Sequence, residues 1–211
     1  MAKLGESDVY IQGAARYAHA FMPSNKDDAN SANVEAKVFW RSPDTGLAGL
    51  NAGYQSLGLG GFNADYFKAG AQGQLYGSEI VTFSVGAGIF VGGDNTKEAF
   101  DGIYAQGGIN YYLTDNVAAG IGGTFMAADK NNGEVLSINL KGEYLLPTAL
   151  PMSMTLGYNY TDVSDIPGST THAAMFGFKM YFGSGEGDSL STIHRSGSAD
   201  NGNPSVPLLG Y

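Results

Sequence analysis

Hydrophobic and polar residues alternate one by one along most of this chain. The clearest case is the segment from Met152 to Thr161, where the even positions are apolar and the odd positions are Ser, Thr, Asn or Gly. Residues 81–91 and 136–144 show the same alternation. A period of two is typical of β-strands, because successive side chains of a strand point to opposite sides of the sheet. The pattern therefore predicts an all-β protein.

Ten such segments follow one another along the chain. They cover residues 8–21, 33–42, 47–57, 63–76, 80–91, 101–113, 117–127, 134–146, 151–162 and 171–182. Most have about 10–14 residues, whereas an ordinary strand has about 5–6 and a tilted strand needs about 9–11 to cross a bilayer. The segments are therefore long enough to span a membrane.

Short and longer connections alternate between these segments. The short ones are residues 42–45, 77–79, 114–116 and 147–150. The longer ones are residues 23–32, 92–100, 128–133 and 163–170, with a glycine-rich link at 58–61. This alternation is typical of outer-membrane barrels, which have short periplasmic turns and longer outer loops. We expect a closed antiparallel transmembrane up-and-down β-barrel of about ten strands, with eight as the alternative count, over residues 1–182.

Composition supports a β-rich membrane protein and excludes several other classes. The chain has 32 Gly and 12% aromatic residues among its 211 residues, and only 15% are charged. A net charge of −9 argues against a nucleic-acid partner, and the lack of Cys excludes disulfide scaffolds and thiolate zinc sites. A soluble lipocalin-like barrel is the main alternative, but its outer face would be charged. Tyr and Phe gather near strand ends, Tyr66, Tyr76 and Tyr112 among them, as expected for two interfacial girdles.

If the apolar faces point to lipid, the polar faces point into a lumen. The charged residues placed there by the alternation are Arg16, Glu35, Lys37, Arg41, Lys68, Lys141, Glu143 and Lys179. Rings of Lys and Arg select anions, so one interpretation is a narrow pore that favours anions. The other is a closed core, because ten strands enclose little space and these side chains can fill it. The sequence leaves both open.

Candidate catalytic groups are few, and we expect no enzyme. His19 and His172 fall near the outer ends of the first and last predicted strands, where they could meet if the barrel closes. A serine nucleophile needs a base within hydrogen-bond reach, and no spacing in the chain supplies one. Two histidines of the aromatic belt are the simpler interpretation. We expect no cofactor and no metal.

Two segments resemble small porin-like outer-membrane β-barrel proteins of Gram-negative bacteria. In residues 107–120 a strand ends in aromatics, turns on Asp-Asn and restarts with small residues, as in that family. Residues 177–182 resemble its assembly signal, with Gly177, Met180 and Phe182 at the matching positions. The resemblance covers about residues 8–182. It implies an outer-membrane location with lipid, lipopolysaccharide and the barrel-assembly machinery as partners. No secretory signal follows Met1, so we expect a processed form.

The last part of the chain, residues 183–211, changes character. Residues 183–188 read as a flexible Gly/Ser-rich linker, and Leu208, Leu209 and Tyr211 make the end apolar. The alternatives are a flexible periplasmic tail, a plug that folds back into the lumen, or a peptide that docks on a partner or on a second copy. The expected function is therefore a non-enzymatic porin-like barrel or a structural surface barrel. The alternative is a structural barrel that self-assembles or docks a partner through this tail.

Overall fold

The computed structural model describes residues 2–4, 8–20, 29–42, 44–59, 62–94, 99–129, 133–148, 152–164, 170–181 and 188–196. Within these ranges the chain forms one sheet of a very short strand and ten long ones, followed by a single helix. The strands are β1 (Ala2–Lys3), β2 (Val9–Ala20), β3 (Ala29–Ser42), β4 (Gly46–Leu59), β5 (Phe62–Ser78), β6 (Val81–Asp94), β7 (Ala99–Thr114), β8 (Val117–Ala128), β9 (Glu134–Leu145), β10 (Met152–Val163) and β11 (Thr171–Met180), and the helix is α1 (Leu190–Ser196).

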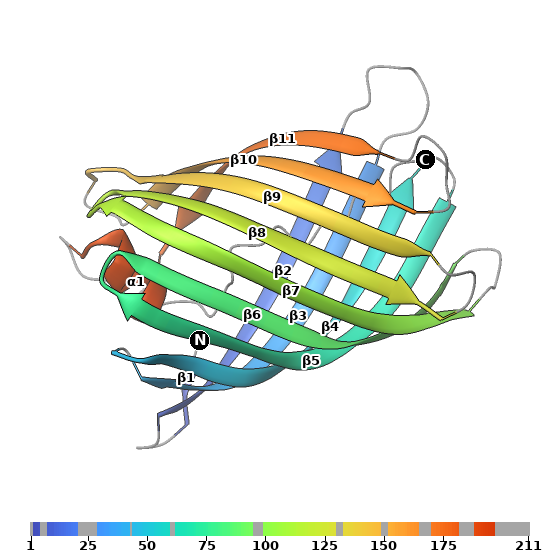
Figure 1. Ribbon diagram of the computed structural model, residues 1–211, viewed down its shortest axis with the longest axis horizontal. Coiled ribbons are helices and arrows are strands. Elements are labelled where there is room, and N and C mark those ends of the chain that lie inside the picture. The colour runs from blue at the N-terminus through green and yellow to red at the C-terminus, as the bar shows by residue number, and fades with distance from the viewer. Residues whose placement is uncertain are drawn as a thin grey trace.

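The strands follow one another in the sheet as they do in the chain. Each pairs antiparallel with its predecessor, from β1 to β11. Figure 1 shows that the sheet curls, so that β2, β3 and β4 pass behind β6 to β9. The amide of Asn51 on β4 donates across the interior to the hydroxyl of Tyr104 on β7, at 3.4 Å. The prediction of ten antiparallel up-and-down strands is confirmed, the count of eight is wrong, and the shape is barrel-like.

The strands reach further than the alternation indicated. β3 begins at Ala29, inside the connection expected at 23–32, and the ladder between β3 and β4 continues to the pair Ala29 and Leu59. β5 then begins at Phe62, so the glycine-rich link is almost absorbed into strands. Backbone hydrogen bonds can extend a ladder through polar residues that show no alternation, so the sequence pattern marks only the central part of each strand.

The two sides of the sheet differ as the alternation predicts. On β3, Val34 is 60% exposed and points outward, whereas its neighbour Glu35 is 6% exposed and points inward. One expectation is wrong. Tyr66, Tyr76 and Tyr112 are buried on the inner side, so they cannot belong to an outer aromatic girdle. Tyr66 packs with Phe90 and Tyr104, and Tyr112 packs in a cluster with Leu190 and Ile193.

The turn between β3 and β4 requires glycine. Gly46 has a φ of +151°, outside the range that other residues commonly adopt. A Cβ atom at this position would collide with the carbonyl of Gln74 on β5. The tight turn and the close approach of β5 therefore both depend on the missing side chain.

Hydrogen bonds do not close the sheet within the described residues. One edge of β2 pairs with β3 along its length, and the other edge pairs with β1 at Tyr10 and Ile11. β11 pairs with β10, and the described ladders include none between β11 and β2. A strand has only two edges, and β1 already pairs with the second edge of β2 at Tyr10 and Ile11. β11 therefore cannot pair with β2 at these two residues to close the predicted barrel.

Candidate functional site

The charged residues assigned to the lumen face the inside of the curled sheet. Glu35, Lys37, Arg41 and Glu143 are buried there. Lys68, Lys141 and Lys179 lie on the same side and are partly buried. The side chain of Arg16 lies outside the described part of the structure, although its backbone belongs to β2. The described interior carries five cationic groups and two carboxylates from this set.

The first carboxylate, Glu35, lies at the centre of a paired cluster. Its oxygens are 3.4 Å from Nζ of Lys37 and 3.9 Å from Nζ of Lys68, and Asn51 Nδ2 donates to Oε1 at 3.0 Å. Burying a charge is costly unless it is paired and hydrogen-bonded. The alternation puts Glu35 and Lys37 on the same side of β3. The register of the next two strands brings the other partners: Asn51 pairs with Lys37, and Lys68 pairs with Gly53, the residue opposite Glu35.

The second carboxylate, Glu143, lies at the centre of a larger cluster. This cluster is near the end of the strands that carries the short turns, here called the turn end. Nζ of Lys141 is 2.9 Å from Oε2, and Nζ of Lys179 on β11 is 3.4 Å from the same oxygen. Ser153 Oγ on β10 donates to Oε1 at 2.6 Å, and the hydroxyl of Tyr181 donates there as well. Glu143 thus joins β9, β10 and the end of β11 through one buried side chain.

Helix α1 was not predicted from the sequence. Ser189 caps it, because its Oγ accepts the backbone N–H of Thr192 at 3.3 Å. The helix lies at one end of the curled sheet, beside the turn between β7 and β8, where Leu190 N–H donates to the carbonyl of Asp115 at 2.7 Å. Seven residues are too few for a stable isolated helix, so its stability has to come from packing.

That packing is provided by the apolar side of α1. Leu190 and Ile193 are almost completely buried, in one cluster with Tyr112, Ala118 and Leu145. Leu190 and Ile193 are three residues apart, so they lie on one side of the helix. The helix therefore covers the inner side of β7, β8 and β9 at the turn end and narrows the opening there.

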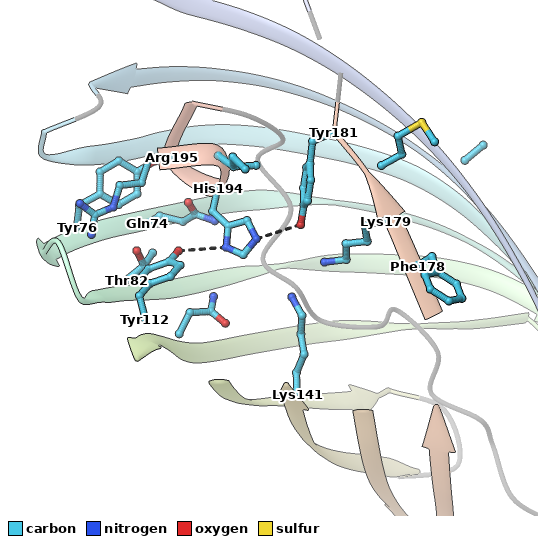
Figure 2. Close-up of a pocket in the computed structure, with 14 residues that line it drawn as sticks. Gln74, Tyr76, Thr82, Tyr112, Lys141, Phe178, Lys179, Tyr181, His194 and Arg195 are labelled. Atoms are coloured by element: carbon cyan, nitrogen blue, oxygen red, sulfur yellow. Dashed lines mark hydrogen bonds between the residues drawn. The ribbon is translucent and has the colours of Figure 1, made fainter. Parts of the chain in front are cut away.

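Two polar residues of α1 hold it to the sheet (Figure 2). His194 lies between two hydroxyls, with Nδ1 3.2 Å from Tyr112 and Nε2 3.2 Å from Tyr181. The guanidinium carbon of Arg195 is 4.9 Å from the ring centre of Tyr76. Arg195 also donates to the backbone carbonyls of Ser78 and Val81, the latter at 3.3 Å. Both ends of the β5–β6 turn are thereby linked to the tail.

His194 also contacts the Glu143 cluster. Its Nε2 is 3.4 Å from Oε1 of the carboxylate. Burial lowers the pKa of His194, and this outweighs the opposing effect of the hydrogen bond to Glu143; Lys141 and Lys179 lower the pKa further. The neutral ring therefore dominates at pH 7, with one N–H to donate and one nitrogen to accept, which suits a position between two hydroxyl groups.

A cavity of about 500 Å³ lies beside α1. On the interior side it is lined by polar and charged residues of the sheet and of the helix, including Gln74, Lys141, Lys179, His194 and Arg195. It also reaches Ala15 on β2 and Phe178 and Met180 on β11. Figure 2 shows Lys141 and Lys179 pointing towards one another beside this cavity, with His194 between Tyr112 and Tyr181.

The candidate catalytic histidines do not form a constellation with a described base or nucleophile. His172 is exposed, and its Nδ1 is 2.6 Å from the hydroxyl of Tyr158 on the neighbouring strand. The side chain of His19 lies outside the described part. Among the described residues, no group of three or more His, Asp or Glu side chains could hold a metal ion.

The remaining predicted residues are placed only in part. Gly177 and Met180 belong to β11, where they pair with Thr155 and Met152 of β10, and Met180 points outward. Phe182 lies outside the described residues, as do Leu208, Leu209 and Tyr211 at the predicted docking end. The structure therefore places the middle of the tail but not its apolar end.

Sequence reasoning missed the residues that hold α1. A signal for them exists: Ser189 precedes two apolar residues at the spacing of one helical face, Leu190 and Ile193. Such a signal is weak over seven residues, and His194 gains its partners only when α1 meets strands far away in the chain. Tyr112, one partner, is 82 residues away.

No helix of the described residues is long and apolar enough to cross a membrane.

Comparison with known proteins finds no relative. No protein-family model, no curated protein and no solved structure matches this chain.

Proposed function

We propose that this chain is an integral β-barrel of a bacterial outer membrane, non-enzymatic and porin-like, whose narrow passive permeability is restricted by α1. The observation that carries the proposal is the inversion of its two surfaces. Large apolar side chains are exposed on each of the ten long strands, while Gln, Asn, Ser, Glu and Lys side chains are buried inside. Soluble monomers rarely expose apolar patches larger than a few hundred Å². A bilayer is the environment that matches an apolar belt around a polar interior.

The charges agree with this environment. On β5, Lys68 points inward, as do Lys141 on β9 and Lys179 on β11. Asp65 is exposed on the outer side but lies only three residues after the start of β5 at Phe62, where a charged side chain reaches the interface. A charged side chain at the bilayer midplane costs about 2–4 kcal/mol for Arg or Lys, and less near the interfaces.

The filled interior supports slow conduction by the intact protein. The Glu35 and Glu143 clusters place paired charges inside it. Helix α1 covers part of the end where the short turns lie, which the loop lengths assign to the periplasm. The excess of cationic over acidic groups among the described lumen residues favours anions. Since α1 binds its own barrel, the structure favours a plug over a docking role for this part of the tail.

Removal of the tail tests the plug. We expect a chain ending at Gly183 to fold and to show larger and more frequent conductance steps in planar bilayers than the full chain, with anions favoured. Ile193→Asp, which keeps the chain length, should have a similar effect because it places a carboxylate in the apolar cluster with Leu145 and Tyr112. Unchanged conductance in both variants would mean that α1 does not restrict the pore.

Trp40 tests the membrane location independently. It is the only tryptophan, is 48% exposed on the outer side and lies two residues before the end of β3. In vesicles, brominated lipids should quench its fluorescence, most strongly with bromine near the head groups, because Trp is favoured at that depth. In the double variant Leu140→Trp, Trp40→Phe, the fluorescence should be quenched most strongly by lipids that carry bromine deep in their acyl chains. Quenching by aqueous iodide alone would contradict the proposed location.

A further inference from the structure

The cavity beside α1 passes through the wall of the sheet at the edge of β11. Phe178, Lys179 and Met180 are consecutive residues of this strand, and all three line the cavity. Successive side chains of a strand point to opposite sides, and Phe178 and Met180 are indeed exposed on the outside while Lys179 points inside. The cavity therefore reaches residues whose side chains point to both sides of β11, which indicates that it lies at the edge of this strand.

The other wall of this opening is β2. Ala15 of β2 lines the same cavity, so the cavity lies between β11 and β2, the two ends of the ten-strand ladder. Towards the turn end, β1 pairs with the edge of β2 that faces β11, at Tyr10 and Ile11. The opening is therefore built into the strand pairing and does not depend on the orientation of a single side chain.

The inner end of the opening is suited to an anion. Lys141 and Lys179 approach it from two strands, and Arg195 and His194 approach it from α1. Glu143 contacts both lysines; it is nearly fully buried and hydrogen-bonded to Ser153 and Tyr181. Lys141, Lys179 and Arg195 thus bring three cationic groups to a cavity whose described lining contains no carboxylate. A carboxylate or phosphate ligand would improve this balance and form charge-assisted hydrogen bonds.

The outer end is suited to an alkyl chain. Phe178 is 61% exposed and Met180 is also exposed, and both belong to the surface that the proposed function places in lipid. A cavity of about 500 Å³ lies within the range of about 300–1,000 Å³ usual for small-molecule sites. The lining thus changes from cationic inside to apolar outside along one continuous path.

We propose that this opening binds a single-chain amphiphile with an anionic head group, with the head at Lys179 and Lys141 and the chain along Phe178 and Met180. The inference rests on the proposed function, because the chain would leave the cavity towards the lipid. It adds a ligand site to a protein otherwise proposed as a passive barrel. A carboxylate or a phosphate head would meet the same cationic groups.

The test uses the full chain refolded in an uncharged maltoside detergent and native mass spectrometry with defined probes. We expect dodecanoate or dodecyl phosphate to bind at one molecule per chain, at least about tenfold more tightly than dodecanol or dodecyltrimethylammonium. Butyrate, which has the head group without the chain, should bind at least about tenfold more weakly than dodecanoate. Equal binding of dodecanol and dodecanoate, or of butyrate and dodecanoate, would overturn the proposal.

Matched variants locate the site. Lys179→Gln should weaken dodecanoate binding at least about tenfold, whereas Lys68→Gln, an interior lysine outside the cavity lining, should not. Phe178→Ser is the second variant, since it leaves the charge cluster intact and should weaken long chains but not butyrate. Heat-dependent migration in gels checks that each variant folds. Dodecanoate binding as tight as in the wild type by both Lys179→Gln and Phe178→Ser would exclude this opening. The proposed membrane location is judged separately by Trp40 quenching, so either idea can fail alone.

Discussion

Replacing Leu140 by lysine will strongly destabilise the membrane-inserted protein. Leu140 lies at the middle of β9, is 49% exposed on the outer side and has Ile121 and Tyr158 as its ladder neighbours. In a bilayer its side chain would be near the midplane, where lysine costs about 2–4 kcal/mol. We expect a loss of this size in urea unfolding of the protein in vesicles, together with a lower yield of inserted protein.

Two comparisons make this result specific to the membrane. Leu140→Ser removes the apolar side chain without adding a charge and should cost less than lysine. If the outer side instead faced water, Leu140→Lys would be an ordinary surface substitution, with an effect within about 0.5 kcal/mol. An effect that small would contradict the proposed membrane location, whatever the conductance of the protein.

The second large effect is expected at Glu143. Glu143→Gln keeps the size of the side chain but leaves the Lys141 and Lys179 ammonium groups without their shared carboxylate. Breaking a buried ion pair by removing one partner typically costs about 3–5 kcal/mol. We expect a loss of that order in the free energy of unfolding, measured by linear extrapolation in urea. We also expect a stronger preference for anions in conductance, because the interior loses a negative charge.

The control for this prediction lies on the same strand. Glu134→Gln removes an exposed carboxylate at the other end of β9 and should change stability by less than about 0.5 kcal/mol. Adding Lys141→Gln and Lys179→Gln to Glu143→Gln should recover part of the loss, because the uncompensated charges are then gone. Wild-type stability of Glu143→Gln would show that the cluster around Glu143 contributes little.

The sequence predicts the β-sheet because the alternation that marks a strand depends only on neighbouring residues. Each residue of a strand points to the side opposite its neighbour, so the alternation over residues 152–161 already assigns Ser153 and Asn159 to the inside, where both are buried. The same parity places Glu35, Lys37 and Glu143. The expectation that failed was the outer girdle for Tyr66, Tyr76 and Tyr112, which rested on residue type: a tyrosine suits either an interface or a polar core. The alternation itself puts Tyr66 and Tyr76 on the same side of β5 as Lys68, where they are buried.

The partners of those inward residues depended on tertiary structure. Lys141 and Glu143 share a side of β9 by local geometry, but Lys179 joins them from β11, two strands away in the sheet. Which strands face each other across the interior follows from the curl of the whole sheet. No pattern within one segment contains that information.

The sequence by itself thus determined the ten long strands, their order of pairing and the side to which most charged residues point, since all three follow from period-two alternation and short connections. Only the tertiary structure decided that α1 forms, that His194 and Arg195 hold it at the turn end, and that β1 takes part of the edge of β2. Each of these depends on contacts between segments far apart in the chain. Such contacts can form and stabilise the structure only after the sheet has curled. The opening between β2 and β11 is a product of that final arrangement.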